Sequence, residues 1–536
     1  MPVIESAIDT KAAAFAQNQT QQLALLADVR GLEAKIRAHS ERSRAKFSAR
    51  GQLPPRDRID LILDRGTPFI ELSTLAGLGM HDDDGKDNVF GGGNIAGIGV
   101  IGGVTCVVSA SDSAIKGGAA TPMGLEKGLR VQEIALKQKL PYVQMVESAG
   151  ANLLRQSELF IKGGRSFANL ARLSAAGIPV ISLVHGSSTA GGAYQPGLSD
   201  HVIVVRGRSK IFLAGPPLLK AATGEIATDE DLGGAEMHYH ISGLAEYMAE
   251  DDADGIRIAR EVMAKLNYGG FARDTNFAPP RYSADELLGV VPVDYRKPYD
   301  VREVIARIVD DSDFLDFKPA FGPHTVVGRA AIEGHPVGII GNNGPIDTDG
   351  AAKAAQFIQM CTQTGVALLF LQNTTGYLVG RQAEENGIVK HGSKMIQSVA
   401  NAAVPKITLH IGGSFGAGNY GMCGRAFDPD FIFAWPNNRV SVMGGDQAAK
   451  VMTIIAEEGA RRAGKEIDHA ALDAQAKFIV DLYDKESTAH FATARLWDDG
   501  IIDPRDSRKV VGFCLSICRE ARMRQLHPSS FGVARM

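Results

Sequence analysis

The chain has 536 residues, and 60 of them are glycine, about 11% against a usual share of roughly 7%. Hydrophobic residues make up 45% and charged residues 22%, which is typical of a globular protein and excludes a disordered or collagen-like one. The formal net charge of −4, without a dense basic run, excludes a nucleic-acid-binding footprint.

The cysteines and the apolar segments indicate the cellular compartment of the protein. The five cysteines are scattered and odd in number, which argues against a disulfide framework and for a reducing environment. The N-terminus resembles neither a signal peptide nor a transit peptide, and no apolar stretch reaches the length of about 18 residues that a transmembrane helix needs. We therefore expect a cytoplasmic protein without nucleic-acid or membrane partners.

The first fifty residues are rich in helix formers. Apolar side chains recur there at helical spacing, at Leu23, Leu26, Val29, Leu32 and Ile36. Pro54 and Pro55 end the pattern, and residues 56–63 begin a second amphipathic segment. Residues 1–55 are therefore predicted to form an N-terminal helical arm.

Strand-like and helix-like segments alternate along the rest of the chain. The strand-like runs include 104–109, 142–147 and 180–184, and the helix-like stretches include 122–139 and 166–176. This alternation predicts an α/β fold. Glycine and proline interrupt the pattern over 267–282, which predicts a domain boundary there.

An internal repeat relates the two halves of the chain. One offset of 226 residues aligns residues 123–194 with 349–420 without a gap, and it places Ser188 on Ser414. Chance similarity would not keep one offset through a helix, a strand, a turn and another helix. The period is far too long for a solenoid, so the repeat predicts two domains of one fold.

Two glycine patterns fit the dinucleotide fingerprint G-x-G-x-x-G. The first, at 97–102, precedes a strand-like run and not a helix, so a hairpin turn is the better interpretation. The second, at 416–421, follows a strand, but its repeat partner at 190–195 does not keep the pattern. The chain also lacks the P-loop motif, so neither pattern predicts nucleotide binding.

A third motif, Gly412-Gly-Ser414-Phe-Gly416, fits the G-x-S-x-G nucleophile elbow of serine hydrolases. His469, His490 and His527 follow in the order that such an enzyme requires. The equivalent Ser188 lacks the closing glycine, because Ala190 stands there. A serine hydrolase that uses Ser414 is an alternative function at this stage.

Both repeats place small residues between a buried strand and a helix. These runs are 187–193 and 413–418. Backbone without bulky side chains at a helix N-terminus presents N–H groups outward, and such groups bind an anion or an oxyanion. Two equivalent turns therefore suggest that two developing oxyanions are stabilised in one reaction.

The sequence resembles the carboxyltransferase (β) subunits of biotin-dependent acyl-CoA carboxylases, in particular the methylcrotonyl-CoA and geranyl-CoA branch. The similar segments are 61–72, 116–118, 130–135, 147–152, 212–217, 220–225, 338–344, 412–425 and 440–445. The resemblance implies two tandem crotonase-like domains in an α/β fold. It places an acyl-CoA domain at residues 56–275 and a biotin domain at residues 282–530.

The resemblance also implies roles for individual residues. It places the acyl thioester oxygen at the N–H groups of Gly191 and Gly192, and the ureido oxygen of biotin at those of Ala417 and Gly418. The implied substrate-binding residues are Ala149, Gly150, Gly163, Gly164, Arg165, Ala190 and Tyr194. The implied biotin-binding residues are Gly376, Phe415, Gly416, Asn419 and Tyr420. No metal is expected in this chain.

The biotin attachment signature Ala-Met-Lys-Met is missing, so the resemblance implies that a partner α subunit carries biotin and the biotin carboxylase activity. It further implies a homohexamer at the core of an α6β6 complex. A decarboxylase subunit of the same fold is a second alternative function.

At one position the chain differs from the methylcrotonyl-type relatives in a way that affects the expected substrate. Methylcrotonyl-type relatives have an aromatic residue before the Gly-Arg pair that matches Gly164 and Arg165, and this chain has Gly163 there. The missing ring predicts a deeper acyl pocket and a longer, geranyl-CoA-like substrate. A local rearrangement of the segment 162–165 is the alternative.

Overall fold

The computed structural model of the chain describes residues 3–80, 91–269 and 276–535. The chain divides into two compact units, which are described separately here. One holds Arg30–Ala272, Ala494–Leu496 and Ile517–Met536, and the other holds Met1–Val29, Arg273–Thr493 and Trp497–Ser516. The domain limits 56–275 and 282–530 stay predictions, and the boundary expected over 267–282 lies partly outside the described residues.

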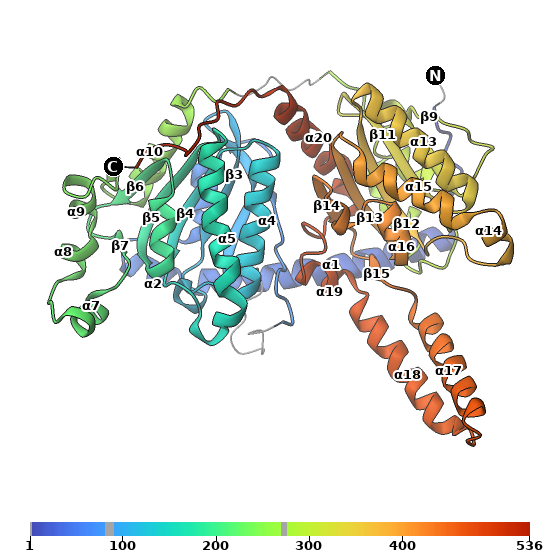
Figure 1. Cartoon of the computed structure of the whole chain (residues 1–536). Coiled ribbons are helices and arrows are strands. Elements are labelled where there is room, and N and C mark those ends of the chain that lie inside the picture. The colour runs from blue at the N-terminus through green and yellow to red at the C-terminus, as the bar shows by residue number, and fades with distance from the viewer. Residues whose placement is uncertain (1–2, 81–90, 270–275, 536) are drawn as a thin grey trace. The chain divides into compact units, whose positions relative to one another are not determined.

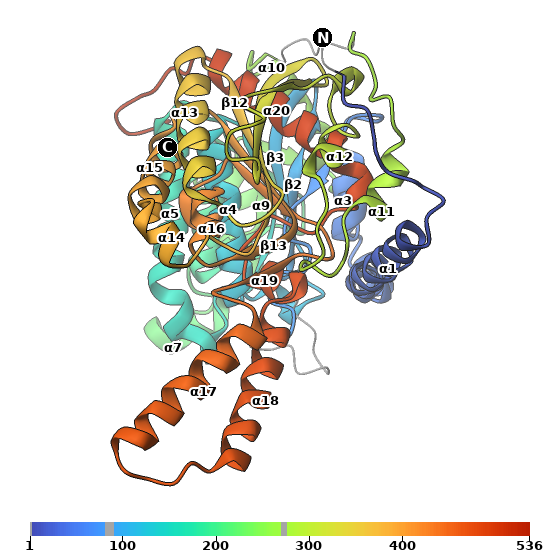
Figure 2. The same cartoon turned by 90° about the vertical axis from the view of Figure 1, so that its right-hand side faces the viewer.

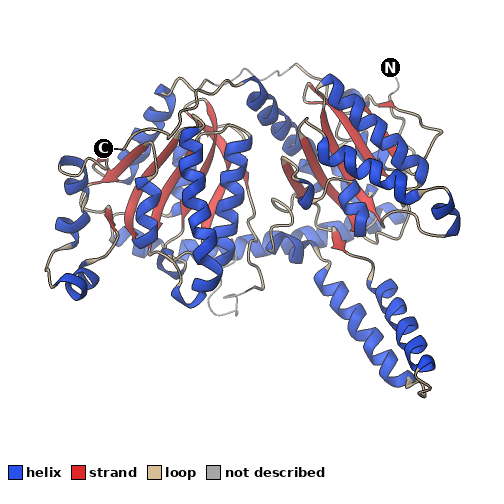
Figure 3. Ribbon diagram, in the orientation of Figure 1, coloured by secondary structure: helices blue, strands red, loops and turns tan. Residues whose placement is uncertain are grey.

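Strands and helices alternate in both units, as the sequence predicted (Figure 3). In the N-terminal half the strands are β1 Ile70–Glu71, β2 Asn94–Ile101, β3 Val104–Ser111, β4 Tyr142–Ser148, β5 Val180–Thr189, β6 His201–Val205, β7 Lys210–Phe212 and β8 Tyr247–Ala249. They form a mixed sheet in the order β1-β2-β3-β4-β5-β6-β8, and β7 pairs with the end of β5. The pairs β3–β4, β4–β5, β5–β6 and β6–β8 are parallel.

The C-terminal half repeats this sheet. Its strands are β9 Leu315–Asp316, β10 Thr325–Ile332, β11 His335–Asn342, β12 Ala367–Thr374, β13 Lys406–Phe415, β14 Phe431–Ala434 and β15 Arg439–Ser441. The order is β14-β13-β12-β11-β10-β9, and β15 pairs with the end of β13. Apart from β8, which has no counterpart among the described strands of the second sheet, the two sheets share one topology, with an antiparallel hairpin at one side and parallel strands in the centre.

Helices cover the sheets in matching positions. In the N-terminal half they are α3 Pro55–Ile62, α4 Pro122–Lys137, α5 Gln156–Ala175, α6 Tyr194–Gly197, α7 Pro216–Thr223, α8 Asp229–Gly233, α9 Ala235–His240 and α10 Asp252–Lys265. In the C-terminal half they are α11 Leu287–Val290, α12 Val301–Ile305, α13 Thr348–Thr364, α14 Arg381–Glu385, α15 Ile388–Asn401, α16 Gly416–Gly421, α17 Gly445–Arg462 and α18 His469–Glu486. The pairs α4–α5 and α13–α15 each lie side by side over their own sheet (Figure 1).

The remaining helices are α1 Ala13–Arg42, α2 Arg44–Ala49, α19 Ala489–Ala494 and α20 Ser507–Met523. Of these, α1, α19 and α20 contain residues of both units. Helices α17 and α18 form an antiparallel pair that extends away from the C-terminal sheet (Figure 1 and Figure 2). Among the described residues, no helix is both long enough and apolar enough to span a bilayer.

The offset of 226 residues holds at the level of hydrogen bonds. It places the ends of β5 on those of β13, residue for residue. The Thr121 side chain caps α4 by accepting from the Gly124 N–H, and Asp347 caps α13 by accepting from the Gly350 N–H. The expected internal duplication of an α/β domain is therefore confirmed.

Two details of the sequence prediction can be compared with the elements. The pattern at 97–102 belongs to the antiparallel hairpin of β2 and β3, with Gly102 and Gly103 at positive φ in its two-residue turn, so the hairpin interpretation is confirmed. The helix expected over 166–176 was predicted too short, because α5 begins at Gln156. Gly163 and Gly164 weaken helix propensity within α5, and its packing against α4 compensates.

Packing between neighbouring strand ends requires glycine in both halves. A Cβ added at Gly186 would lie 2.6 Å from Glu147 Oε1, and one added at Gly412 would lie 2.5 Å from Asn373 Oδ1. Glu147 and Asn373 are themselves related by the offset. The strand that ends at each turn therefore accepts the side chain of its neighbour into a space that only glycine leaves open.

We predict that Gly186→Ala and Gly412→Ala each lower the free energy of unfolding by about 1–3 kcal/mol, because the new methyl group overpacks a filled site. Gly197→Ala is the control, since no atom lies within 4 Å of its added Cβ. Urea denaturation of the three variants measures the effect. Equal stability of Gly186→Ala and Gly197→Ala would contradict the packing argument.

Candidate active site

The candidate sites lie where two central parallel strands end. Strand β4 ends at Ser148 beside β5, and strand β12 ends at Thr374 beside β13. The register shifts between Val146 and Ser148 in one half and between Gln372 and Thr374 in the other. Ligands of parallel α/β sheets bind at the carboxyl ends of the strands. The register shift therefore falls at the same, ligand-binding edge of both sheets.

The turn after the second strand begins with the same φ in both halves and continues as a short helical segment. Ala190 and Gly416 occupy equivalent positions, and each has φ of +53°. The next two residues are Gly191 and Gly192 in one half, and Ala417 and Gly418 in the other. They belong to the first turn of a short helical segment, where backbone N–H groups have no partner within the helix. These groups can therefore donate to an anion.

Tight packing holds the second donor of each turn. A Cβ added at Gly192 would lie 2.6 Å from Ser148 Oγ, and one added at Gly418 would lie 2.8 Å from the Gly376 Cα. Both glycines are buried, whereas Gly191 and Ala417 are exposed. The turn thus rests directly on the end of the neighbouring strand, with one donor residue on its outer side.

A second glycine loop faces each turn. Gly150 and Gly376 have φ of +84° and +119°, which disfavours other residues. The Gly150 carbonyl accepts from the Ala120 N–H at 2.8 Å, and the Gly376 carbonyl accepts from the Ile346 N–H at 2.9 Å. A neighbouring loop therefore fixes the same segment in both halves.

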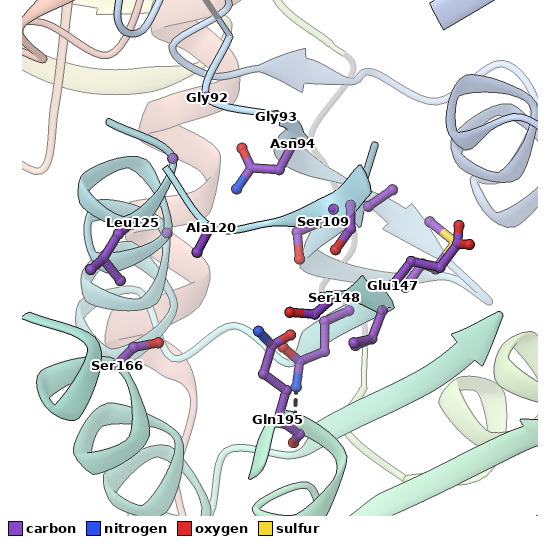
Figure 4. Close-up of a pocket in the computed structure, with 18 of the residues that line it drawn as sticks. Gly92, Gly93, Asn94, Ser109, Ala120, Leu125, Glu147, Ser148, Ser166 and Gln195 are labelled. Carbon is purple, nitrogen blue, oxygen red and sulfur yellow. Dashed lines mark hydrogen bonds between the residues drawn. The ribbon is translucent and has the colours of Figure 1, made fainter. Parts of the chain in front are cut away.

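In the N-terminal half a cavity of about 140 Å³ adjoins the loop at Ser148 (Figure 4). Its wall includes Leu125 on α4, Ser166 on α5 and Gln195 on α6. The Gln144 amide in its lining donates to Ser182, to Ser199 and to the Gln195 carbonyl. Much of the polar lining is thus engaged within the protein.

The residues expected to bind acyl-CoA do not line this cavity themselves, but several are direct neighbours in sequence of residues that do. Gly163, Gly164 and Arg165 follow one another on α5, and Ser166 next to them lines the cavity. Tyr194, 45% exposed, packs against Phe167 with ring centroids 5.6 Å apart. Ala149 and Gly150 follow Ser148 directly. All of these residues belong to the N-terminal half.

The residues expected to bind biotin lie around the second turn. Tyr420, 47% exposed, stacks on Phe427 with centroids 5.9 Å apart. Phe415 is buried and its ring lies 4.8 Å from that of Tyr295. The Asn419 amide donates to the Ser414 hydroxyl at 2.7 Å, so this side chain forms part of the support of the turn.

Ser414 does not have the environment of a nucleophile. Its side chain is fully buried, and its hydroxyl donates to Gln372 Oε1 and accepts from Asn419. A serine nucleophile needs a hydrogen bond to a general base and access to the substrate. The serine hydrolase alternative is therefore rejected.

Sequence reasoning missed a buried ionic network beneath the loop that follows Ser148. Arg58, fully buried in α3, lies 2.8 Å from Glu147 Oε2, and Glu147 directly precedes Ser148. Asp252 lies 3.5 Å from Arg58 and 2.9 Å from the buried His185. Burial and the Arg58 charge lower the pKa of His185, which favours the neutral ring.

The same network holds Asp252 ionised. Burial opposes its charge, but the hydrogen bond from His185 and the Arg58 charge outweigh burial and lower the pKa of Asp252. The one sign of this network in the sequence is the charged Glu147 within an otherwise apolar and polar-neutral buried strand. Its partners lie far away in the sequence, so spacing could not identify them.

These features together define two copies of one α/β fold, each with a helical turn whose main-chain N–H groups can donate to an anion, which is the architecture of a crotonase-like enzyme. Within the described residues, no group of three or more His, Cys, Asp or Glu side chains could hold a metal ion.

Comparison with known proteins agrees with this class. The model of the carboxyl transferase domain family matches residues 46–533. The crystal structure of the Pseudomonas aeruginosa geranyl-CoA carboxylase β subunit is 56% identical, with a TM-score of 0.94 and full coverage of both chains. A probable biotin-dependent acyl-coenzyme A carboxylase β2 subunit of Mycobacterium tuberculosis is 47% identical, with full coverage of both chains.

A probable mitochondrial methylcrotonoyl-CoA carboxylase β chain of Drosophila melanogaster is 45% identical over 100% of this chain and 95% of the relative. The chain belongs to the carboxyl transferase family. The predicted crotonase-like fold and the predicted class, a carboxyltransferase (β) subunit of a biotin-dependent acyl-CoA carboxylase, are confirmed.

The two turns differ at one strained position, and this difference can be tested. Gly416→Ala is expected to lower stability by about 1–2 kcal/mol, because a left-handed backbone disfavours alanine. Its Cβ would also lie 3.0 Å from the Val442 carbonyl oxygen. Ala190→Gly is expected to stabilise the protein by up to about 1 kcal/mol, since it removes the same strain. Thermal denaturation measures both, and destabilisation by Ala190→Gly would contradict the prediction.

Proposed function

We propose that the N-terminal half binds acyl-CoA and the C-terminal half binds biotin, and that the two turns stabilise the charges that develop during carboxyl transfer. The observation that carries this proposal is the equivalent turn in both halves, with φ of +53° at Ala190 and at Gly416 and a short helical segment after each. One reaction with two developing oxyanions needs two such sites.

The chain's own groups then have defined tasks. The N–H groups of Gly191 and Gly192 donate to the thioester oxygen as it becomes an enolate oxygen. Those of Ala417 and Gly418 donate to the ureido oxygen of biotin, which gains charge when the carboxyl group leaves. Biotin supplies the carboxyl group and a ureido nitrogen that can accept a proton from the acyl-CoA. Removal of one oxyanion donor typically costs about 10²–10³ in rate.

Glycines on α5 support an extended acyl chain as the substrate. Gly163 and Gly164 lie within a helix of 20 residues, and no atom lies within 4 Å of a Cβ added at either. Each costs the helix about 1 kcal/mol relative to alanine, and close packing does not require them. Space beside Gly163 for part of the substrate explains the glycine. The relative that is named a geranyl-CoA carboxylase supports the same assignment.

Exposed apolar side chains beside both sites support assembly with other subunits. Leu154 is 94% exposed and Phe160 is 77% exposed next to the acyl site, and Val379 is 77% exposed next to the biotin site. Large apolar patches next to a site mark interfaces. We propose that the N-terminal half of one copy faces the C-terminal half of another in a homohexamer, to which α subunits that carry biotin are added as α6β6.

The cysteines support the expected cytoplasmic, reducing environment. Cys106, Cys361, Cys423, Cys514 and Cys518 are free and buried. Free cysteines are typical of proteins that are kept reduced.

Substitution at Gly163 tests the substrate. Gly163→Phe is expected to lower kcat/KM for geranyl-CoA by at least about tenfold, because the ring would occupy the space proposed for the extended acyl chain, and such pocket differences distinguish substrates by about 1–3 kcal/mol. The kcat/KM for 3-methylcrotonyl-CoA is expected to stay within about threefold of its original value. Gly163→Ala is the control, since it restores helix propensity with little volume. The assay is carboxylation by the reconstituted complex. A preference of the unaltered complex for 3-methylcrotonyl-CoA would overturn the substrate assignment.

Reconstitution tests the reaction and the assembly. Carboxylation is expected to require ATP, bicarbonate and the biotinylated partner, whereas a decarboxylase would release CO2 from the carboxylated product without ATP. The mass of the chain alone and with its partner gives the stoichiometry. A stable monomer that transfers carboxyl groups would contradict the proposed assembly.

A further inference from the structure

Hydroxyl side chains lie in matched pairs beneath the two turns. Ser148 pairs in register with Ser188 across β4 and β5, and Thr374 pairs with Ser414 across β12 and β13. All four side chains are buried. The offset of 226 residues thus preserves a hydroxyl group at both positions of the pair.

The first hydroxyl of each pair holds the facing glycine loop. Ser148 Oγ accepts from the Gly150 N–H at 3.1 Å, and Thr374 Oγ1 accepts from the Gly376 N–H at 3.2 Å. The contact is the same in both halves. It fixes the loop and not the donors of the turn.

The second hydroxyl holds the turn itself. Ser188 Oγ donates to the carbonyl oxygen of Gly192 at 3.0 Å. Ser414 Oγ donates to Gln372 Oε1 and accepts from Asn419 Nδ2 at 2.7 Å, so it links the neighbouring strand to α16. Gln372 also donates to the Met422 carbonyl at the end of α16. Each serine therefore ties the donor segment to the sheet.

We propose that Ser188 and Ser414 are the positioning residues of the two oxyanion sites, and this inference rests on the proposed function. Neither side chain is accessible to a substrate, since both are fully buried. Ser188 holds the Gly192 carbonyl, which belongs to the peptide unit after the two donors. Ser414 holds Asn419, which follows Gly418. Each hydroxyl therefore fixes the donor segment from the position next to it, and with it the direction of the N–H groups at 191–192 and 417–418. The sites differ in construction, because Ser188 holds the backbone directly and Ser414 acts through two amide side chains.

Such residues act on the rate and not on ground-state binding. The oxyanion exists only in the transition state and the intermediate, so a tilted donor loses its effect there. A displacement of about 1 Å can cost about 10²-fold in rate. Ser188→Ala and Ser414→Ala are therefore expected to lower kcat by roughly 10–100-fold and to leave KM for both substrates within about threefold.

Matched controls exist on the same strands. Ser182 and Thr408 are also fully buried and also related by the offset. The Ser182 hydroxyl lies 2.7 Å from that of Ser199, and Thr408 Oγ1 donates to the Cys423 carbonyl at 2.7 Å. Ser182→Ala and Thr408→Val remove a buried hydroxyl at a distance from the turns. They are expected to retain kcat within about threefold, because loss of a buried hydrogen bond by itself affects stability.

The experiment measures kcat, KM and thermal stability of the four variants in the reconstituted complex. It also measures the affinity of a nitro analogue of the acyl-CoA, whose anion mimics the enolate. Ser188→Ala is expected to weaken the analogue at least tenfold without weakening the acyl-CoA, whereas Ser414→Ala is expected to bind both normally. Unchanged kcat in the serine variants, or an equal loss in the controls, would overturn the inference. Failure of the unaltered complex to transfer carboxyl groups would instead overturn the proposed function.

Discussion

Close contact between two strand ends is the constraint on which both halves of the molecule depend. Gly186 and Gly412 leave the space that Glu147 and Asn373 occupy, and Gly192 and Gly418 bring the turn onto the neighbouring strand end. If these strands were farther apart, the two donors of each turn would lose their support. The topology, the shifted register and the small residues together allow the two strand ends to lie in close contact.

Buried charged and polar side chains in the strands beneath the turns support them. In the N-terminal half, the buried Arg58 compensates Glu147 and Asp252, so the strand that leads to Ser148 carries charge without exposing it. In the C-terminal half, Asn373 stands in place of the carboxylate, and the donors and acceptors are neutral amides and hydroxyls. A buried carboxylate without its cation would destabilise the fold. Arg58 therefore holds α3 next to the end of β4.

The sequence predicted the duplicated α/β fold, because small and apolar residues recur at a single offset over about 70 positions. It also identified the runs of small residues at 187–193 and 413–418, because both copies keep small residues between a buried strand and a helix. It could not predict which hydroxyl contacts which acceptor, because the partners of Ser188 and Ser414 depend on backbone direction. The Arg58 network escaped notice for a similar reason, as its members are joined only by folding. The extent of α5 was underestimated because tertiary packing overrides the weak propensity of two glycines.

Main-chain donors have a consequence for the genetics of this enzyme. A scan that replaces each residue by alanine leaves every donor N–H group of both turns in place, and Ala417 is already alanine. Such a scan would find no residue whose side chain performs the chemistry. At the turns themselves, damaging changes should be those that add atoms, at glycines such as Gly192 and Gly418, whereas beneath the turns the loss of a supporting hydroxyl should be damaging.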